Sequence, residues 1–445
     1  MTSPTHHRHA SGVDRARALS GGSRDYDELF EFIGDRRFVL LGEGTHGTHE
    51  FYRERARITR RLIEEKGFHA VAVEADWPDA YRVNRFVLDR SDDIDAAAAL
   101  CDFERFPAWM WRNHDFMDFV GWLRGHNDAV ANASQKVRLY GLDLYSLRSS
   151  MDAVVTYLEA VDPEAAAQAR LRYACFDHVG REGTDYGRSV TIDPMASCER
   201  EVVAQLVDLR RRSQAILSRD GLVAGDEYFF AEQNARLVNN AERYYRAMYR
   251  GRVPSWNLRD RHMAETLDRL AHHLDAQLGR SKLVVWEHNS HVGDARATEM
   301  GQFGELNVGQ LVRSGWEDDC VLVGFTTAEG WVTAASDWGG VAERKRVRPP
   351  MPGSYEQYFS ECQLDDFVLM LGPTSRDPLF GPLLERAIGV IYRPETERLS
   401  HYFQARIAMQ FDAVVHLTRT TAVEPLDPNS VWDAGELAET FPSGL

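Results

Sequence analysis

Short, uninterrupted apolar runs constrain this sequence most, because they are typical of strands buried on both faces of a parallel sheet. Three such runs lie at residues 38–43 (FVLLGE), 70–76 (AVAVEAD) and 137–144 (VRLYGLDL). Between the first two, residues 49–67 carry many charges and an apolar stripe with helical spacing. A strand, a helix and a strand in this order predict a βαβ unit.

The middle of the chain has a different pattern. Residues 151–280 show long helical periodicity and no convincing strand, with the clearest helices expected at 197–217, 227–248 and 258–278. Strand patterns then return, and the later ones are expected to include antiparallel edge members. They lie at residues 282–288, 319–327, 367–372, 388–394 and 412–418.

These patterns predict an α/β fold with a largely parallel central sheet, helices on its flanks and an α-helical insertion. The expected order begins with a flexible leader and ends with a C-terminal tail. The segments are the leader at 1–23, the first part of the core at 24–150, the insertion at 151–280, the second part of the core at 281–426 and the tail at 427–445.

The net charge and the cysteine content argue against several classes of protein. With 52 Lys and Arg against 68 Asp and Glu, the formal net charge is −16, whereas nucleic acids and anionic membranes bind basic surfaces. No apolar stretch approaches the roughly 20 residues of a membrane span, and no secretory signal is visible. The five cysteines are widely spaced without a CxxC pair, which argues against a disulfide framework or a zinc ribbon. We therefore expect a cytoplasmic protein with reduced thiols and a small-molecule substrate, and neither nucleic acid nor membrane as a partner.

Acids and histidines collect where the predicted strands end. Glu43 and His46 follow the first run, Glu74 lies near the end of the second, and His288 and His291 follow a later one. In open α/β sheets, ligands bind outside the carboxyl ends of the strands. If these strands are parallel and adjacent, the five side chains converge in one cleft.

Glu74 indicates what such a cleft could do. It lies between Val73 and Ala75 in a run that is expected to be buried, and a buried carboxylate must be paired or hydrogen-bonded. A histidine partner would satisfy it, and the carboxylate would raise the basicity of that imidazole, which could then take a proton from water. No G-x-S-x-G elbow is present, so a serine nucleophile is less favoured than an activated water.

Two alternatives stay open on the residues alone. His46 and His49 lie three positions apart, as do His288 and His291, and such a set with glutamates could bind zinc or manganese and activate a bound water. The pattern matches neither H-E-x-x-H nor H-x-x-E-H. The second alternative is a non-catalytic protein that binds a small ligand in the same cleft.

At these motifs the chain resembles the erythromycin esterase family. The resemblance runs over roughly residues 25–426. It is carried by LLGEGTHGTHEFYRERARITRRLI (40–63), VAVEADWPDAYRVNRF (71–86), YGLDLYSL (140–147), VVWEHNSHVGDAR (284–296) and the stretch from IGVIYRPETERL to VEPL (388–426).

The resemblance implies a fold, a reaction and a set of residues. It agrees with an α/β core that carries a helical insertion, and it implies hydrolysis of the macrolactone ester of erythromycin-type antibiotics, hence resistance to them, without a metal or another cofactor. His46 matches the general base for water and Glu74 its acidic partner. Glu43, Arg55, His288 and His291 match other residues of the cleft, and Arg55 is expected to stabilise an anion there.

Overall fold

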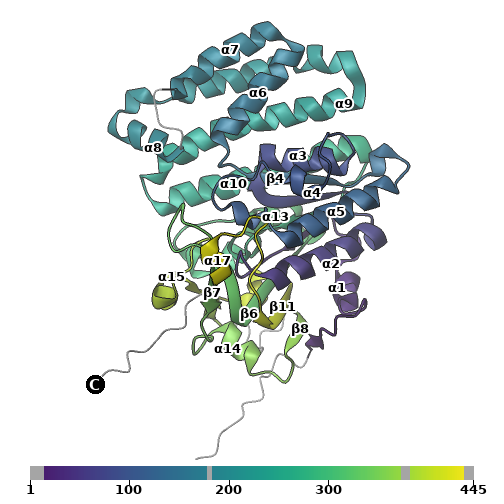
Figure 1. Cartoon of the computed structure of the whole chain (residues 1–445), viewed down its shortest axis with the longest axis vertical. Coiled ribbons are helices and arrows are strands. Elements are labelled where there is room, and N and C mark those ends of the chain that lie inside the picture. Colours follow the sequence, from purple (N-terminus) through teal and green to yellow (C-terminus); the bar gives the residue numbers. More distant parts are fainter. Residues whose placement is uncertain (1–14, 178–182, 372–380, 435–445) are drawn as a thin grey trace, which may run out of the picture.

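The computed structural model describes residues 15–177, 183–371 and 381–434. Its centre is a nine-stranded sheet with the order β1-β8-β11-β6-β2-β5-β3-β4, and β7 pairs with β6 beside this path (Figure 1). The strands are β1 (Arg17–Ala18), β2 (Phe38–Leu41), β3 (Ala70–Asp76), β4 (Arg138–Asp143), β5 (Leu283–Trp286), β6 (Cys320–Ala334), β7 (Glu343–Val347), β8 (Asp366–Met370) and β11 (Ala413–Thr420).

The six strands from β11 to β4 along this path are parallel, whereas β1, β7 and β8 pair antiparallel at the margins. Alternate residues of β2 pack into different cores: Phe38 and Leu40 into one, Val39 and Leu41 into the other. The strand is thus buried on both faces, which explains why its sequence is continuously apolar. The predicted α/β fold with a largely parallel sheet is confirmed.

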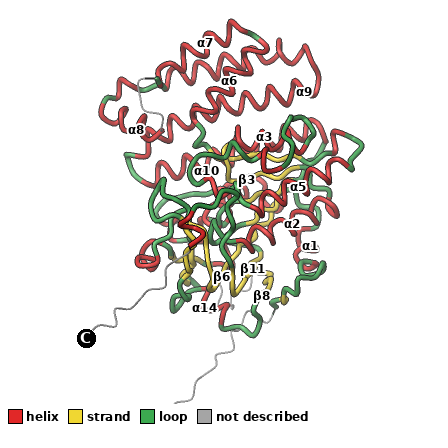
Figure 2. The backbone as a smooth tube through the Cα atoms, viewed as in Figure 1, coloured by secondary structure: helices red, strands yellow, loops and turns green. Residues whose placement is uncertain are grey.

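Helices cover both faces of the sheet, as Figure 2 shows. The face with Val39 and Leu41 packs against the helices before β4, and the opposite face packs against α10 and α13. The covering helices are α1 (Asp27–Ile33), α2 (His49–Lys66) and α5 (His114–Asp128) on the first face, and α10 (Arg252–Leu278) and α13 (Val308–Trp316) on the second. α3 (Trp77–Val87) lies at the edge and contributes to both cores.

Between β4 and β5 the described chain is helical. α6 (Leu147–Val161), α7 (Pro163–Tyr173), α8 (Gly183–Ile192) and α9 (Glu199–Met248) stack at one end of the molecule in Figure 1. α10 returns from them to the sheet and packs on β4. The predicted helices at 197–217 and 227–248 are parts of one 50-residue helix, α9.

The remaining elements are short. β9 (Leu383–Arg386) and β10 (Tyr402–Ala405) form a separate two-stranded sheet. The short helices are α4 (Ala96–Ala99), α11 (Asn289–Val292), α12 (Glu299–Gln302), α14 (Tyr355–Ser360), α15 (Glu397–Ser400), α16 (Ile407–Gln410) and α17 (Ser430–Ala434).

Three expectations are changed by the structure. The predicted strand at 388–394 is wrong, because this segment makes only isolated bridges, at Ile388 and Ile391. Cys175 and Cys198 form a disulfide, so the prediction of reduced thiols is wrong for this pair. The expected leader lies partly outside the described residues, and its residues 17–18 pair with β8. Within the described ranges, no helix is long and apolar enough to cross a membrane.

Candidate active site

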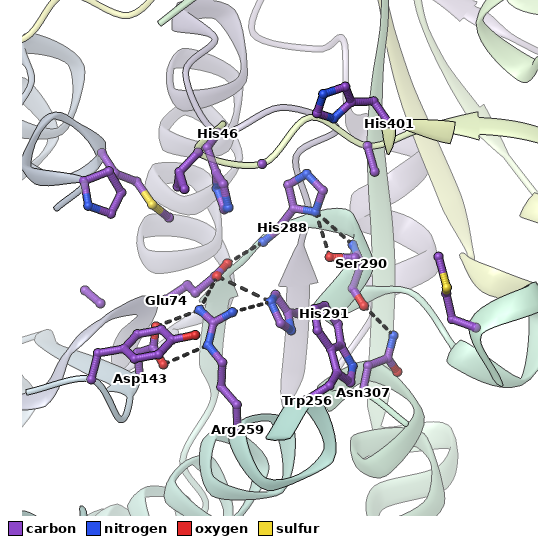
Figure 3. A pocket seen from close by; sticks show the side chains of 18 of the residues that line it. His46, Glu74, Asp143, Trp256, Arg259, His288, Ser290, His291, Asn307 and His401 are labelled. Atoms are coloured by element: carbon purple, nitrogen blue, oxygen red, sulfur yellow. Dashed lines mark hydrogen bonds and ion pairs between the residues drawn. The ribbon is translucent and has the colours of Figure 1, made fainter. Parts of the chain in front are cut away.

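The carboxyl ends of four neighbouring strands meet at one cavity. β2, β5, β3 and β4 lie side by side and parallel, so the side chains that end them are brought together (Figure 3). The cavity measures about 340 Å³, within the range of small-molecule sites. Of the six predicted site residues, His46, Glu74, His288 and His291 line it.

The loops that follow β2 and β5 are hydrogen-bonded to each other beside the cavity. Asn289 follows β5, and its backbone N–H donates to the Glu43 carbonyl at 2.8 Å. Its side-chain amide donates to the Phe325 carbonyl at 2.8 Å and accepts from the Phe325 N–H at 3.1 Å. A Cβ at Gly42 would lie 2.1 Å from the Asn289 Oδ1, so this approach requires glycine. The glycines after β2 thus allow GEGTH and EHNSH to lie in contact.

His46 has a carboxylate partner, and that partner is Glu43. The Nδ1 of His46 lies 2.9 Å from one Glu43 oxygen, and Arg55 Nη2 donates to the other at 2.7 Å. Glu43 and Arg55 are fully buried, and the Arg55 guanidinium lies over the rings of Tyr52 and Trp286. Neither Glu43 nor Arg55 lines the cavity. Arg55 therefore lies behind Glu43, not where a stabiliser of a substrate anion was expected.

Glu74 makes contacts different from those predicted. Its Oε1 accepts from Arg259 at 2.7 Å and lies 3.4 Å from the Nε2 of His291, and its Oε2 accepts from the backbone N–H of His288 at 2.8 Å. Burial favours the neutral acid, but the positive charges of His291 and Arg259 outweigh it and hold the pKa of Glu74 well below its usual range. Glu74 therefore anchors the loop after β5 instead of pairing directly with His46.

His291 is enclosed by residues of α10. Its Nδ1 lies 2.8 Å from Asp260, Arg259 Nη1 lies 3.0 Å from its Nε2, and the ring stacks on Trp256 with centroids 4.7 Å apart. Burial lowers the pKa of His291, yet Asp260 and Glu74 together raise it to about 9. The two carboxylates thus favour the imidazolium near neutral pH, in which the Nε2–H is directed to Glu74 at 3.4 Å and not to Arg259.

α10 is the part of the site that sequence reasoning missed. Arg259 also donates to Asp143 at the end of β4, at 2.7 and 3.0 Å, so it joins two strand ends. The sequence of α10 contains one sign of this role. Asp260 falls on the same helical stripe as Met263 and Leu267, and an acid on an apolar stripe needs a buried partner.

His288 lies beside His46, with ring centroids 4.7 Å apart. The Ser290 N–H donates to the Nδ1 of His288 at 3.2 Å, and the Ser290 hydroxyl lies 2.9 Å from the same atom. Burial lowers the pKa of His288 well below its ordinary value. The ring is therefore neutral, and because its Nδ1 accepts the Ser290 N–H, its Nε2 carries the proton.

The histidines of the proposed metal alternative are not arranged as one set. His49 lies on α2, where its Nδ1 contacts Asp115 at 2.7–2.8 Å, and it does not line the cavity. Among the described His, Cys, Asp and Glu side chains, no group of three is placed to hold a metal ion. The donor atoms of His46 and His291 are instead engaged by Glu43 and Asp260.

The chain is similar to several known proteins over most of its length. Residues 63–420 match the protein family described as erythromycin esterase. The chain is 21% identical to erythromycin esterase type II of Escherichia coli over 419 residues, which cover 90% of this chain and 93% of that protein. A crystal structure from Bacillus cereus superposes with a TM-score of 0.76 at 19% identity, covering 93% of this chain and 97% of that one. A mutant of erythromycin esterase EreC in its open conformation gives 0.68 at 16% identity, covering 91% and 95%.

Proposed function

The chain belongs to the erythromycin esterase family, whose members are ester-bond hydrolases, and we propose that it cleaves a carboxylic ester or lactone with a water activated by His46. The observation that carries the proposal is the placement of His46. Its Nδ1 is tied to buried Glu43, and its ring lines the cavity. The Nε2 of this ring makes no hydrogen bond to the described part of the chain, so it is available to a water.

The reaction follows from these contacts. If the Nδ1–H of His46 is donated to Glu43, the Nε2 lone pair faces the cavity and can take a proton from water. The resulting hydroxide oxygen bonds to the carbonyl carbon and gives a tetrahedral oxyanion. When the carbon–oxygen bond to the alcohol breaks, the proton held by His46 passes to the leaving oxygen. The products are a carboxylic acid and an alcohol, so one water is consumed.

The other histidines supply positive and hydrogen-bonding groups. His288 presents an Nε2–H next to His46, and the His291 imidazolium adds a fixed positive charge at the cavity wall. Donors and charges arranged before the reaction stabilise an oxyanion without reorganisation, and removal of one such donor costs roughly 100-fold to 1000-fold in rate. Glu74 holds the backbone of His288, and Glu74 and Arg259 both contact the His291 ring.

The names of the related proteins suggest a substrate class. Erythromycin esterase type II and EreC are named for a macrolide, so we propose a macrolactone as the first substrate to test and resistance to such antibiotics as its consequence. A cytoplasmic location and the absence of a nucleic-acid partner remain predictions from the sequence.

The test is a product assay on chelator-treated protein. Purified chain is incubated with erythromycin and with a panel of esters and lactones, and mass spectrometry detects a product heavier by one water. His46→Asn is expected to abolish hydrolysis. His49→Asn is the matched control, because it is the same change in the same motif at a histidine outside the cavity. Activity that survives His46→Asn contradicts the mechanism, and activity that requires added metal supports the metal alternative.

Ser290 offers a second mechanism that the geometry makes worth testing. Its hydroxyl lines the cavity and lies 2.9 Å from the Nδ1 of His288, as a nucleophile and its base would. No described carboxylate orients that imidazole by a side-chain hydrogen bond, in contrast to His46. We therefore expect Ser290→Ala to retain hydrolysis, and mass spectrometry of quenched enzyme to show no acylated serine.

A further inference from the structure

A second, larger cavity adjoins the first. It measures about 1650 Å³ and lies between α3, α6 and α9. Asp76, Asp79 and Arg105 line both cavities. These three residues therefore mark the junction through which a substrate longer than its ester group would extend.

The junction holds carboxylate oxygens that lack partners. Asp76 ends β3, and its Oδ2 accepts from Arg105 at 2.7 Å, whereas its Oδ1 is buried without a hydrogen-bond partner in the described part of the chain. Asp79 lies in the first turn of α3 and is 9% exposed. No described residue offers its carboxylate a hydrogen bond or an ion pair. An acid in the first turn of a helix is ordinary, but such an acid is normally solvated.

The charges around the junction are unbalanced. Asp102, which is ion-paired with Arg82 at 2.5 Å, and Glu104 add negative potential at Asp79. Arg105 is the single cation that lines both cavities in the described chain. Arg105 is already bound by Asp76. Burial, together with Asp76, Asp102 and Glu104, raises the pKa of Asp79 to about 8. The Asp79 carboxyl thus keeps a proton to a higher pH than usual, and a cation beside it would neutralise the same charge.

We propose that the substrate carries a positively charged organic group, an ammonium, which binds Asp79 and Asp76 while its ester lies at His46. This rests on the proposed hydrolysis and specifies its substrate class. An organic cation fits better than an inorganic one for two reasons. No described group of three acids or histidines is placed to hold a metal. The rings of Tyr81, Tyr157 and Phe230 line the outer cavity, and aromatic faces attract alkylammonium groups.

The test uses matched pairs of esters. Each pair carries either a trimethylammonium group or the neutral tert-butyl group of nearly equal shape, at the end of alkyl chains of increasing length. For the chain length that spans the cavities, kcat/KM of the charged ester should exceed that of its neutral partner by about tenfold or more. Asp79→Asn should reduce this ratio to about one. Asp152→Asn is the control, since it removes the same charge from an exposed side chain of the outer cavity and should preserve the ratio.

Binding is measured separately so that it does not depend on hydrolysis. Titration calorimetry follows the trimethylammonium alcohols with wild type and with Asp79→Asn, in two buffers of different ionisation enthalpy. At pH 7 wild type should bind them and release protons, because cation binding expels the proton of Asp79. The Asp79→Asn variant should do neither.

Each outcome decides one proposal. If the charged alcohols bind through Asp79 but no ester is cleaved, the cation site stands and the hydrolase fails. If esters are cleaved with equal kcat/KM in both series, the hydrolase stands and the cation site fails. A loss of kcat/KM that is the same for both esters in Asp79→Asn means a structural role and refutes the proposal. Saturable binding of sodium or calcium ions in place of the ammonium refutes it as well.

Discussion

Glu43→Gln tests the proposed base most directly, because the change preserves shape and alters one atom. Glu43 accepts from His46 Nδ1 and from Arg55 Nη2. Arginine can only donate, so the glutamine oxygen must face Arg55 and its NH₂ must face His46. The Nδ1 of His46 then becomes an acceptor, the ring proton moves to Nε2, and the lone pair that would take a proton from water is lost.

The expected losses of activity and of stability in Glu43→Gln follow from the same contacts. Loss of the general base should lower kcat about 100-fold to 10,000-fold. Arg55 keeps an oxygen partner and its contacts with Tyr52 and Trp286, so the variant should lose about 1–3 kcal/mol of stability rather than the full cost of an orphaned buried charge. Denaturant unfolding measures the second quantity, and kcat for the best ester measures the first.

Two results would refute this reasoning. The first is a folded Glu43→Gln variant with kcat within about threefold of wild type, since the tautomer of His46 would then not matter. The second comes from the double variant with His46→Asn. If the two residues act as one unit, the double variant is no slower than His46→Asn alone, whereas multiplied losses would mean that they act independently.

Three further predictions follow from buried charges. Glu74→Gln removes the carboxylate shared by Arg259 and His291 and should cost about 3–5 kcal/mol in urea unfolding; a loss below about 1 kcal/mol would contradict the anchoring role. The folded pKa of His291, about 9, exceeds its ordinary 6.5, so its stabilisation is complete below pH 6.5 and is lost as the pH rises through about 9. Unfolding free energies of wild type should therefore fall more across this window than those of Asp260→Asn, and parallel curves would refute the assignment. The pKa of Asp79 is likewise raised from 3.8 to about 8, so Asp79→Asn should be more stable than wild type at pH 8, with a gap that closes toward pH 4; a gap independent of pH would mean that Asp79 is ionised throughout.

Local patterns sufficed for the strands of the core. A strand buried on both faces must be apolar at every position, so β2, β3, β4 and β5 were visible as runs, and their ends located Glu43, His46, Glu74 and His288. The segment at 388–394 begins with a similar apolar run but makes only isolated bridges. Apolar composition indicates that a segment is buried. Whether a buried segment forms a strand depends on whether neighbouring strands are placed to hydrogen-bond with it.

The sequence by itself determined the α/β class, the family and four of the residues that line the cavity, because these depend on periodicity and on short motifs. Only the tertiary structure decided which buried acids pair with which basic side chains. Glu43, three residues before His46, makes the contact with His46 that was expected of Glu74. Glu74 instead pairs with Arg259, which lies on a helix 185 positions later in the chain. The reason is physical. A buried carboxylate must find a cation or a donor, but which one it finds depends on side-chain geometry across strands and helices that spacing along the chain does not encode.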